Sequence, residues 1–191
     1  AALSEAIYLC DVKKAKPAGR AGRAAKGAES GKMPILNRAA EMQAEVAGWR
    51  QAIHSTPELG FDVFRTADFV AAKLEAFGCD EVVRGLGRTG VVGVIKGRLG
   101  AGGTIGLRAD MDALPLVEVT GKPYASTVPG KMHACGHDGH TAMLLGAAKY
   151  LAETRNFDGT VAVIFQPAEE GEKGGEAMVL DGMMERFGIQ E

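Results

Sequence analysis

Residues 161–171, Val-Ala-Val-Ile-Phe-Gln-Pro-Ala-Glu-Glu-Gly, contain the stretch that decides the fold. Val161–Phe165 is a short, continuous apolar run rich in β-branched side chains, which is typical of a strand buried on both faces. Strands of this kind occur in sheets that are covered by helices. Pro167 cannot continue the regular structure, so Glu169 and Glu170 are expected just past the end of the strand.

The chain around this strand alternates between helical and extended patterns. Helical patterns place apolar residues three or four positions apart, and strand patterns are short β-branched runs bounded by glycines. The predicted helices cover residues 37–53, 66–77, 138–153 and 175–186. The predicted strands cover residues 81–84, 91–96, 104–108 and 161–165. This alternation predicts an α/β layered domain.

Local signals predict where some elements begin and end. Thr66 is the expected cap of the second helix, and Gly78 is expected to end it. Residues 111–132 show no clear period and contain three prolines, which indicates a long loop. Long loops inside compact domains are often functional.

The composition is that of an ordinary globular protein, with 46% hydrophobic and 24% charged residues in a chain of 191. The net charge of -2 argues against nucleic acid or an anionic membrane as a partner. No apolar run approaches the roughly 18 residues that span a bilayer. Cys10, Cys79 and Cys135 are odd in number and widely spaced, which favours a reducing compartment and a cytoplasmic location.

Residues 1–32 differ in composition from the rest of the chain. They hold seven basic and three acidic side chains among alanines and glycines, with few large apolar residues. Such a segment buries too little surface to offset its chain entropy, so we expect a disordered basic extension. Met33 is then the expected natural start, and residues 33–191 form the folded domain. An organelle transit peptide is the alternative, and the three acidic residues count against it.

The segment Met132–His140, Met-His-Ala-Cys-Gly-His-Asp-Gly-His, holds three of the chain's four histidines, a cysteine and an aspartate. Imidazole, thiolate and carboxylate groups are the ligands that transition metals prefer. Cys135 and His137 stand two positions apart on a loop that enters a helix, so both can face one cation. A helix start that is rich in histidine by chance is the alternative, but the density of ligating groups favours a metal site.

Two pairs of carboxylates follow predicted strands. Asp110 and Asp112 follow the third strand, and Glu169 and Glu170 follow the fourth. In open α/β sheets, ligands bind at the carboxyl ends of the strands, so we expect these pairs and the histidine-rich segment to form one site. Taken alone, each pair could be a turn cap or a solvated acidic loop. Several carboxylates together with histidine and cysteine suit a two-metal hydrolase.

Two other catalytic patterns are weaker. Gly85–Gly90 fits the G-x-G-x-x-G pattern of dinucleotide sites, but a strand follows it instead of the required helix, so we expect a hairpin turn. Cys135, flanked by His133 and His137, could be a nucleophile. The two carboxylate pairs would then have no purpose. His54 is expected to be a helix-end histidine beside a turn.

Five segments together resemble the aminoacylase and hippurate hydrolase branch of the cocatalytic metallopeptidases. This branch includes auxin-conjugate amidohydrolases and N-acetyl-diaminopimelate deacetylases. The resemblance covers about residues 40–191 and implies a three-layer α/β/α catalytic domain like that of the zinc peptidases. The segments are His-Ser-Thr-Pro-Glu-Leu-Gly-Phe (54–61), Gly-Arg-Thr-Gly-Val-Val-Gly (87–93), Arg-Ala-Asp-Met-Asp-Ala-Leu-Pro (108–115), Met-His-Ala-Cys-Gly-His-Asp-Gly-His-Thr-Ala (132–142) and Phe-Gln-Pro-Ala-Glu-Glu (165–170).

The resemblance also implies roles for single residues. Cys135, His137 and Glu170 match ligands of two divalent metal ions, with the thiolate of Cys135 placed to bridge them. Zinc suits such ligands, and manganese, cobalt and nickel are alternatives. Glu169 matches the general base that takes a proton from a water activated by the metals and later delivers it to the leaving amine. Asp112 matches the carboxylate that orients a metal-binding partner.

The activity that the resemblance implies is hydrolysis of the amide bond of N-acyl amino acids such as hippurate. The expected partner is therefore a small N-acyl amino acid, with neither nucleic acid nor membrane, and the relatives are expected to form homo-oligomers. Asp110 is a weaker candidate than Asp112 for the carboxylate that orients a metal-binding partner. His140 is expected to contact the metal ligands rather than the metal.

The chain also departs from the family pattern. Family members are longer and place another ligand histidine shortly after the point where this sequence stops, and a final one near their C-terminus. No histidine follows His140 in this sequence. Family members also insert a smaller lid domain that forms dimers. We therefore expect residues 33–191 to be the N-terminal part of the catalytic domain, incomplete at the C-terminus, and the chain to be a truncated, weakly active form. The alternative is a noncatalytic metal-binding fragment that associates with a partner chain.

Overall fold

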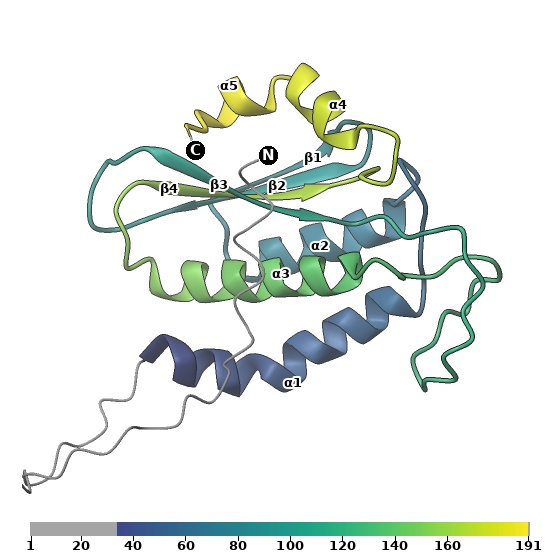
Figure 1. Cartoon of the computed structure of the whole chain (residues 1–191). Helices are drawn as coiled ribbons and strands as arrows, with labels where there is room; N and C mark the ends of the chain where they lie inside the picture. Colours follow the sequence, from purple (N-terminus) through teal and green to yellow (C-terminus); the bar gives the residue numbers. More distant parts are fainter. Residues whose placement is uncertain (1–33, 191) are drawn as a thin grey trace, which may run out of the picture. The chain divides into compact units, whose positions relative to one another are not determined.

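Helices and strands alternate along the chain in the computed structural model, which describes residues 34–190 (Figure 1). The basic extension expected over residues 1–32 lies outside these described residues. None of the helices in the described range is long and apolar enough to cross a membrane. The elements, in order, are α1 (Pro34–His54), α2 (Phe64–Ala76), β1 (Glu81–Leu86), β2 (Gly90–Lys96), β3 (Thr104–Asp110), α3 (His137–Thr154), β4 (Thr160–Gln166), α4 (Gly174–Leu180) and α5 (Met183–Phe187).

The four strands form one mixed sheet in the order β1-β2-β4-β3. β2 pairs antiparallel with both β1 and β4, whereas β3 and β4 run parallel. In the parallel register Asp110 lies opposite Gln166, so β3 and β4 end level with each other. The segments that follow these two strands therefore leave the sheet at the same edge.

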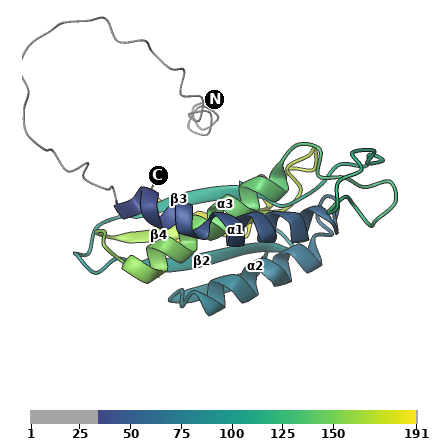
Figure 2. The ribbon, with the colours of Figure 1, turned by 90° about the horizontal axis from the view of Figure 1, so that it is seen from below.

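Helices cover both faces of this sheet, as expected for an α/β/α domain. Figure 1 shows α2 and α3 on one face and the short helices α4 and α5 on the other. The long helix α1 packs on α3 and forms a further layer away from the sheet. Figure 2, seen from below, shows α1 lying over α3 with α2 beside them.

The strand on which the fold prediction rests is buried on both faces. Val163 and Phe165 of β4 pack into the main core with side chains of α2 and α3. Ala162 and Ile164, which point to the opposite face, pack with Met178 and other residues of the second core beneath α4 and α5. This alternation of side chains follows from the two-residue period of a strand, and it confirms the buried strand expected over residues 161–165.

The expected cap of the second helix was wrong. The residue before α2 is Val63, which makes no side-chain capping bond, and Thr66 lies inside the first turn. The carboxylate of Glu58 accepts bonds from the backbone amides of Arg65 (3.1 Å) and Thr66 (2.8 Å). The carboxylate of Glu58, which precedes α2 in sequence, therefore satisfies free backbone amides in the first turn of this helix.

Two further predictions concern glycines. The hairpin turn expected at Gly85–Gly90 is confirmed, because β1 and β2 pair antiparallel across it. The single helix expected over residues 175–186 was wrong. Gly182, with a φ of 80°, adopts the left-handed conformation and divides this stretch into α4 and α5.

Candidate metal centre

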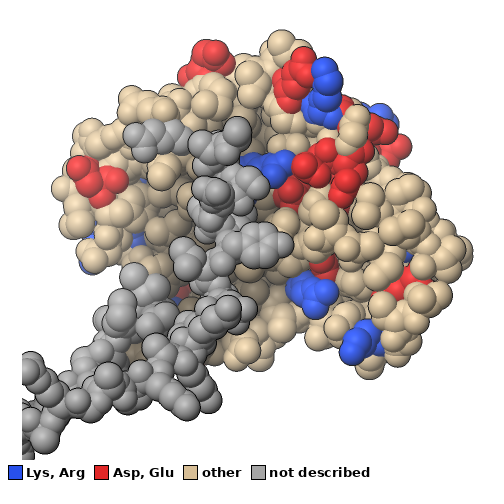
Figure 3. Space-filling view, in the orientation of Figure 1, with Lys and Arg blue, Asp and Glu red and all other residues tan. Residues whose placement is uncertain are grey.

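The candidate site lies where β3 and β4 end and α3 begins. The segments after the two strands carry the two carboxylate pairs, and α3 starts at His137. Gly136, with a φ of 99°, lets the chain turn sharply between Cys135 and His137. Figure 3 shows acidic side chains gathered on the right-hand half of this face, toward the side at which β3 and β4 end. The structure thus brings together the three segments that the sequence predicted to meet.

Cys135, His137 and Glu170 form one group of possible metal ligands. One ligating atom from each, a sulfur, a ring nitrogen and a carboxylate oxygen, lies within 4.8 Å of the other two. His137 is buried, Glu170 is half-buried and Cys135 is exposed, so the group is open on one side. A thiolate, an imidazole and a carboxylate are ligands that fit zinc and related divalent ions.

The ring of His137 is oriented by the backbone. Its Nδ1 lies 2.8 Å from the carbonyl oxygen of Asp112. A carbonyl oxygen can only accept, so Nδ1 carries the proton and Nε2 is left free for a cation. Nε2 lies 3.7 Å from Glu169 Oε2 and 3.8 Å from Glu170 Oε1. Burial lowers the pKa of His137, but the hydrogen bond to Asp112 and the charge of Asp110 outweigh it, so the pKa lies above its ordinary value.

Asp112 holds the turn that carries the two glutamates. Its buried carboxylate accepts bonds from the backbone amides of Glu169 and Glu170, each at 3.0 Å. Burial raises the pKa of Asp112, but the hydrogen bonds from His137 and from the two amides outweigh this and lower it. Asp112 therefore remains an anion that fixes the backbone of Glu169 and Glu170.

Asp110 and His140 form a second group with His137, with ligating atoms within 4.8 Å. However, both carboxylate oxygens of Asp110 already have partners. Oδ1 lies 2.7 Å from His140 Nδ1, and Oδ2 accepts a bond of 2.9 Å from Arg108. The charge of Asp110 is thus compensated within the protein, so the group that includes Cys135 is the better place for a cation. Asp110 and His140 remain the weaker candidates that they were in the sequence.

The electrostatics around Cys135 favour a bound cation over a free nucleophile. Burial, the hydrogen bond with Glu170 and the negative charges of neighbouring carboxylates raise the pKa of the Cys135 thiol. A catalytic cysteine needs the opposite, because only the thiolate attacks. A divalent ion among these carboxylates would instead stabilise the thiolate as its ligand. The donor set therefore fits a metal, and the cysteine nucleophile is disfavoured.

Sequence reasoning missed the surroundings of His54. The residue ends α1, as expected, but it is buried, and its two ring nitrogens lie 2.7 Å from Asp138 Oδ2 and 3.3 Å from Glu118 Oε1. These partners stand 84 and 64 residues away, so no local pattern signals them. The ring of His133 lies nearby, 6.2 Å from that of His54, and its buried nitrogens have no hydrogen-bond partner within residues 34–190.

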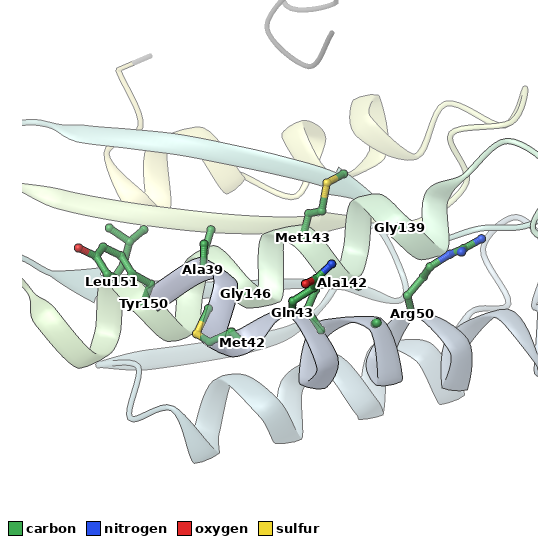
Figure 4. A pocket seen from close by; sticks show the side chains of 13 residues that line it. Ala39, Met42, Gln43, Arg50, Gly139, Ala142, Met143, Gly146, Tyr150 and Leu151 are labelled. Carbon is green, nitrogen blue, oxygen red and sulfur yellow. The ribbon is translucent and has the colours of Figure 1, made fainter. Parts of the chain in front are cut away.

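A large apolar groove lies away from the metal-ligating residues, between α1 and α3 (Figure 4). It has a volume of about 690 Å³ and is lined by residues such as Met42, Val46 and Met143. Arg50 and Gly139 line its end, as Figure 4 shows. It contains none of the expected metal ligands, so it is separate from the candidate metal centre.

Comparison with known proteins agrees with this geometry. Residues 106–191, which include every expected site residue, match the model of the peptidase family M20/M25/M40. Residues 106–191 therefore form part of a peptidase domain of this family. Within it, the chain is 53% identical over 155 residues to a hippurate hydrolase of Campylobacter jejuni, covering 81% of this chain and 40% of that protein. It is 45% identical over 147 residues to an N-acyl-L-amino acid amidohydrolase of Geobacillus stearothermophilus, covering 76% and 39%.

A solved structure gives the same answer for the fold. The YXEP protein of Bacillus subtilis, described as a dinuclear metal binding peptidase of the M20 family, is 40% identical and superposes with a TM-score of 0.72. The match covers 76% of this chain and 40% of that one. The resemblance to the hippurate hydrolase and aminoacylase branch is thus confirmed, and so is the zinc-peptidase-like fold. The chain spans about 40% of the length of the relatives it matches.

Proposed function

We propose that this chain catalyses metal-dependent hydrolysis of the amide bond of N-acyl amino acids. The observation that carries the proposal is the convergence of Cys135, His137 and Glu170 on one point beside the carboxylate of Glu169. The similarity to a hippurate hydrolase and to an N-acyl-L-amino acid amidohydrolase supports this class of substrate. The cysteine pattern further supports a cytoplasmic location.

Cys135, His137 and Glu170 would hold the metal. When bound, two divalent ions supply Lewis acidity, which makes water more acidic and polarises the amide carbonyl. Zinc fits the donor set best, and manganese, cobalt and nickel are alternatives. The dinuclear description of the similar YXEP protein supports two ions rather than one.

Glu169 is the proposed general base. Its side chain is 40% exposed, so it can reach both water and substrate, and Asp112 fixes the backbone on which it stands. The carboxylate takes one proton from the attacking water as the new C–O bond forms. It then gives this proton to the leaving nitrogen as the C–N bond breaks. The products are a carboxylic acid and a free amino acid, so the glutamate ends as it began.

The second candidate function is a noncatalytic metal-binding fragment that associates with a partner chain. The chain spans about 40% of the length of its relatives, and this observation favours the candidate. The two candidates share the metal centre and differ in turnover.

Metal content and hippurate cleavage by the purified 191-residue chain test the proposal. We expect near-stoichiometric metal by mass spectrometry, lost in Cys135→Ala and kept in Cys79→Ala, which changes a cysteine of the core. Glu169→Gln should keep the metal and abolish turnover. Metal without turnover in the unchanged chain would support the noncatalytic fragment. No metal in the unchanged chain would contradict both candidates.

A further inference from the structure

His54 joins two carboxylates that come from different parts of the chain. Its Nδ1 lies 2.7 Å from Asp138 Oδ2, and its Nε2 lies 3.3 Å from Glu118 Oε1. All three side chains are buried, with exposures of 5%, 1% and 3% for His54, Asp138 and Glu118. Buried ionisable groups persist only where they are paired and hydrogen-bonded, so this arrangement is built and not incidental.

Asp138 connects this cluster to the metal centre. It directly follows the expected metal ligand His137 in the first turn of α3. Its Oδ2 also accepts a bond of 2.9 Å from Arg50 Nε, so two residues of α1 hold the same oxygen. An aspartate near a helix start is favourable for that helix. Here it also fixes the first turn of α3 against the end of α1, and the ring of His137 belongs to the same turn.

Glu118 connects the cluster to the long loop over residues 111–132. Its other oxygen accepts a bond from the backbone amide of Ser126, and Thr120 also donates to the carboxylate, so the loop folds around Glu118. The neighbour of His54 adds a second attachment, because the Ser55 carbonyl accepts bonds from the amide (2.9 Å) and the hydroxyl (2.8 Å) of Thr127.

Both ends of this loop belong to the metal centre. Asp112 stands near its start, and the carbonyl oxygen of Asp112 accepts a hydrogen bond from Nδ1 of His137. Cys135 stands three residues beyond its end. His54 therefore lies between the loop that ends next to Cys135 and the helix that begins with His137.

We propose that His54 is a positioning residue for the metal ligand His137, acting through Asp138. The inference rests on the proposed metal centre and adds a determinant of its geometry. A metal site holds its donors to within about 0.5 Å, so a small rotation of the first turn of α3 would misplace Nε2 of His137. Loss of a group that orients a metal ligand typically weakens metal affinity by about 10–100-fold.

Two amide substitutions separate the two bonds of His54. Asparagine places its amide nitrogen near the position of Nδ1 and keeps the bond to Asp138, whereas glutamine reaches the position of Nε2 and keeps the bond to Glu118. We expect His54→Gln to weaken Zn²⁺ binding by the 191-residue chain by about 10–100-fold, measured by competition with a chromophoric chelator. We expect His54→Asn to stay within about threefold of the unchanged chain.

Stability measurements distinguish positioning from a general structural role. Each substitution removes one buried hydrogen bond, so both variants should lose stability to urea by similar amounts. Val70→Ala, which shortens a fully buried side chain of α2, should lower stability without changing Zn²⁺ affinity. If affinity instead follows stability across all three variants, His54 has only a structural role and the proposal is overturned.

A second measurement needs no metal. The rate at which iodoacetamide alkylates Cys135, followed by peptide mass spectrometry, reports the position of the segment before α3. We expect His54→Gln to change this rate in the metal-free chain and His54→Asn to leave it unchanged. This pattern in a chain that binds no Zn²⁺ would support the positioning role while the proposed function fails. Equal rates in the unchanged chain and in both variants would overturn the positioning role.

Discussion

The carboxylate of Asp112 accepts a hydrogen bond of 3.0 Å from the backbone amide of Glu170, a residue 58 positions further along the chain. The amide of Glu169 donates to the other oxygen at the same distance. One buried carboxylate thus fixes the turn that presents both the proposed base and a proposed metal ligand. Two residues with different proposed roles therefore depend on one anchor.

Asp112→Asn should weaken this turn. The asparagine side chain offers one acceptor oxygen, and its NH₂ group would face a backbone donor. We expect Zn²⁺ affinity to fall by about 10-fold or more and stability to fall by about 1–3 kcal/mol, measured by chelator competition and urea unfolding. Asp158→Asn is the matched control, because Asp158 accepts a bond from the Gly102 amide away from the site. Equal affinities in the two variants would contradict the role of Asp112.

Glu58→Ala should destabilise the protein through the start of α2. The carboxylate of Glu58 satisfies two backbone amides of the first turn, and loss of a helix cap costs about 1 kcal/mol. Urea unfolding measures this loss. Glu75→Ala is the control within the same helix, because its pair with Arg84 lies on the surface and contributes about 0.5 kcal/mol or less. A Glu58→Ala variant as stable as the control would show that water replaces the cap.

Two glycine substitutions should have opposite effects. A Cβ atom at Gly97 would lie 2.1 Å from the carbonyl oxygen of Phe157, so we expect Gly97→Ala to cost about 1–3 kcal/mol. Gly48 is exposed on α1 and a Cβ there meets nothing within 4 Å. Gly48→Ala should therefore stabilise the protein by about 0.5–1 kcal/mol through helix propensity. Thermal unfolding of both variants checks the two signs, and a destabilised Gly48→Ala would contradict the open surface of α1.

Cys79 should make stability depend on pH in the alkaline range. Burial raises the pKa of the Cys79 thiol from 9.0 to about 11, with the charge of Arg155 opposing this. Between these values the unfolded chain loses the thiol proton and the folded chain keeps it. The contribution is therefore complete below pH 9 and is lost as the pH rises toward 11.

The half-buried thiol is partly screened by water, so we expect the effect to be about 1 kcal/mol. The measurement is the difference in unfolding free energy between the unchanged chain and Cys79→Ala, at neutral pH and at about pH 10.5. This difference should shrink in the alkaline sample. A difference that is constant with pH would show that the thiol ionises equally in both states.

The fold could be predicted from the sequence where one physical signal dominates. The apolar run at Val161–Phe165 has to be buried on both faces, and the sheet and its covering helices follow from that requirement. Helix ends depend on subtler contributions. Thr66 has the side chain of a cap, but Glu58 carries a full charge and reaches the same amides from outside the helix. The helix predicted over residues 175–186 includes Gly182, because a single glycine inside a helix is tolerated in many proteins.

The residues of the candidate site could be predicted to lie together, but the hydrogen bonds that hold them in place could not. Cys135 and His137 could be predicted as metal ligands from their chemistry, because a thiolate and an imidazole two positions apart are a common pair of ligands for transition metals. The network around His54 was missed because its partners come from a loop and a helix more than sixty residues away. Such pairs become neighbours only after α1, α3 and the long loop have packed together.

The parallel pairing of β3 with β4 gives the metal centre a thermodynamic consequence. It brings Glu170 close to Cys135 and His137, which stand more than thirty residues earlier in the chain, so an ion that binds all three binds the folded state and little else. Each occupied site then adds to the free energy of folding, by about 2.7 kcal/mol when the free ion stands a hundredfold above its dissociation constant. The supply of the bound ion and the abundance of the protein would then be coupled in any cell that makes this chain, because starvation for the ion would send more molecules to the unfolded pool.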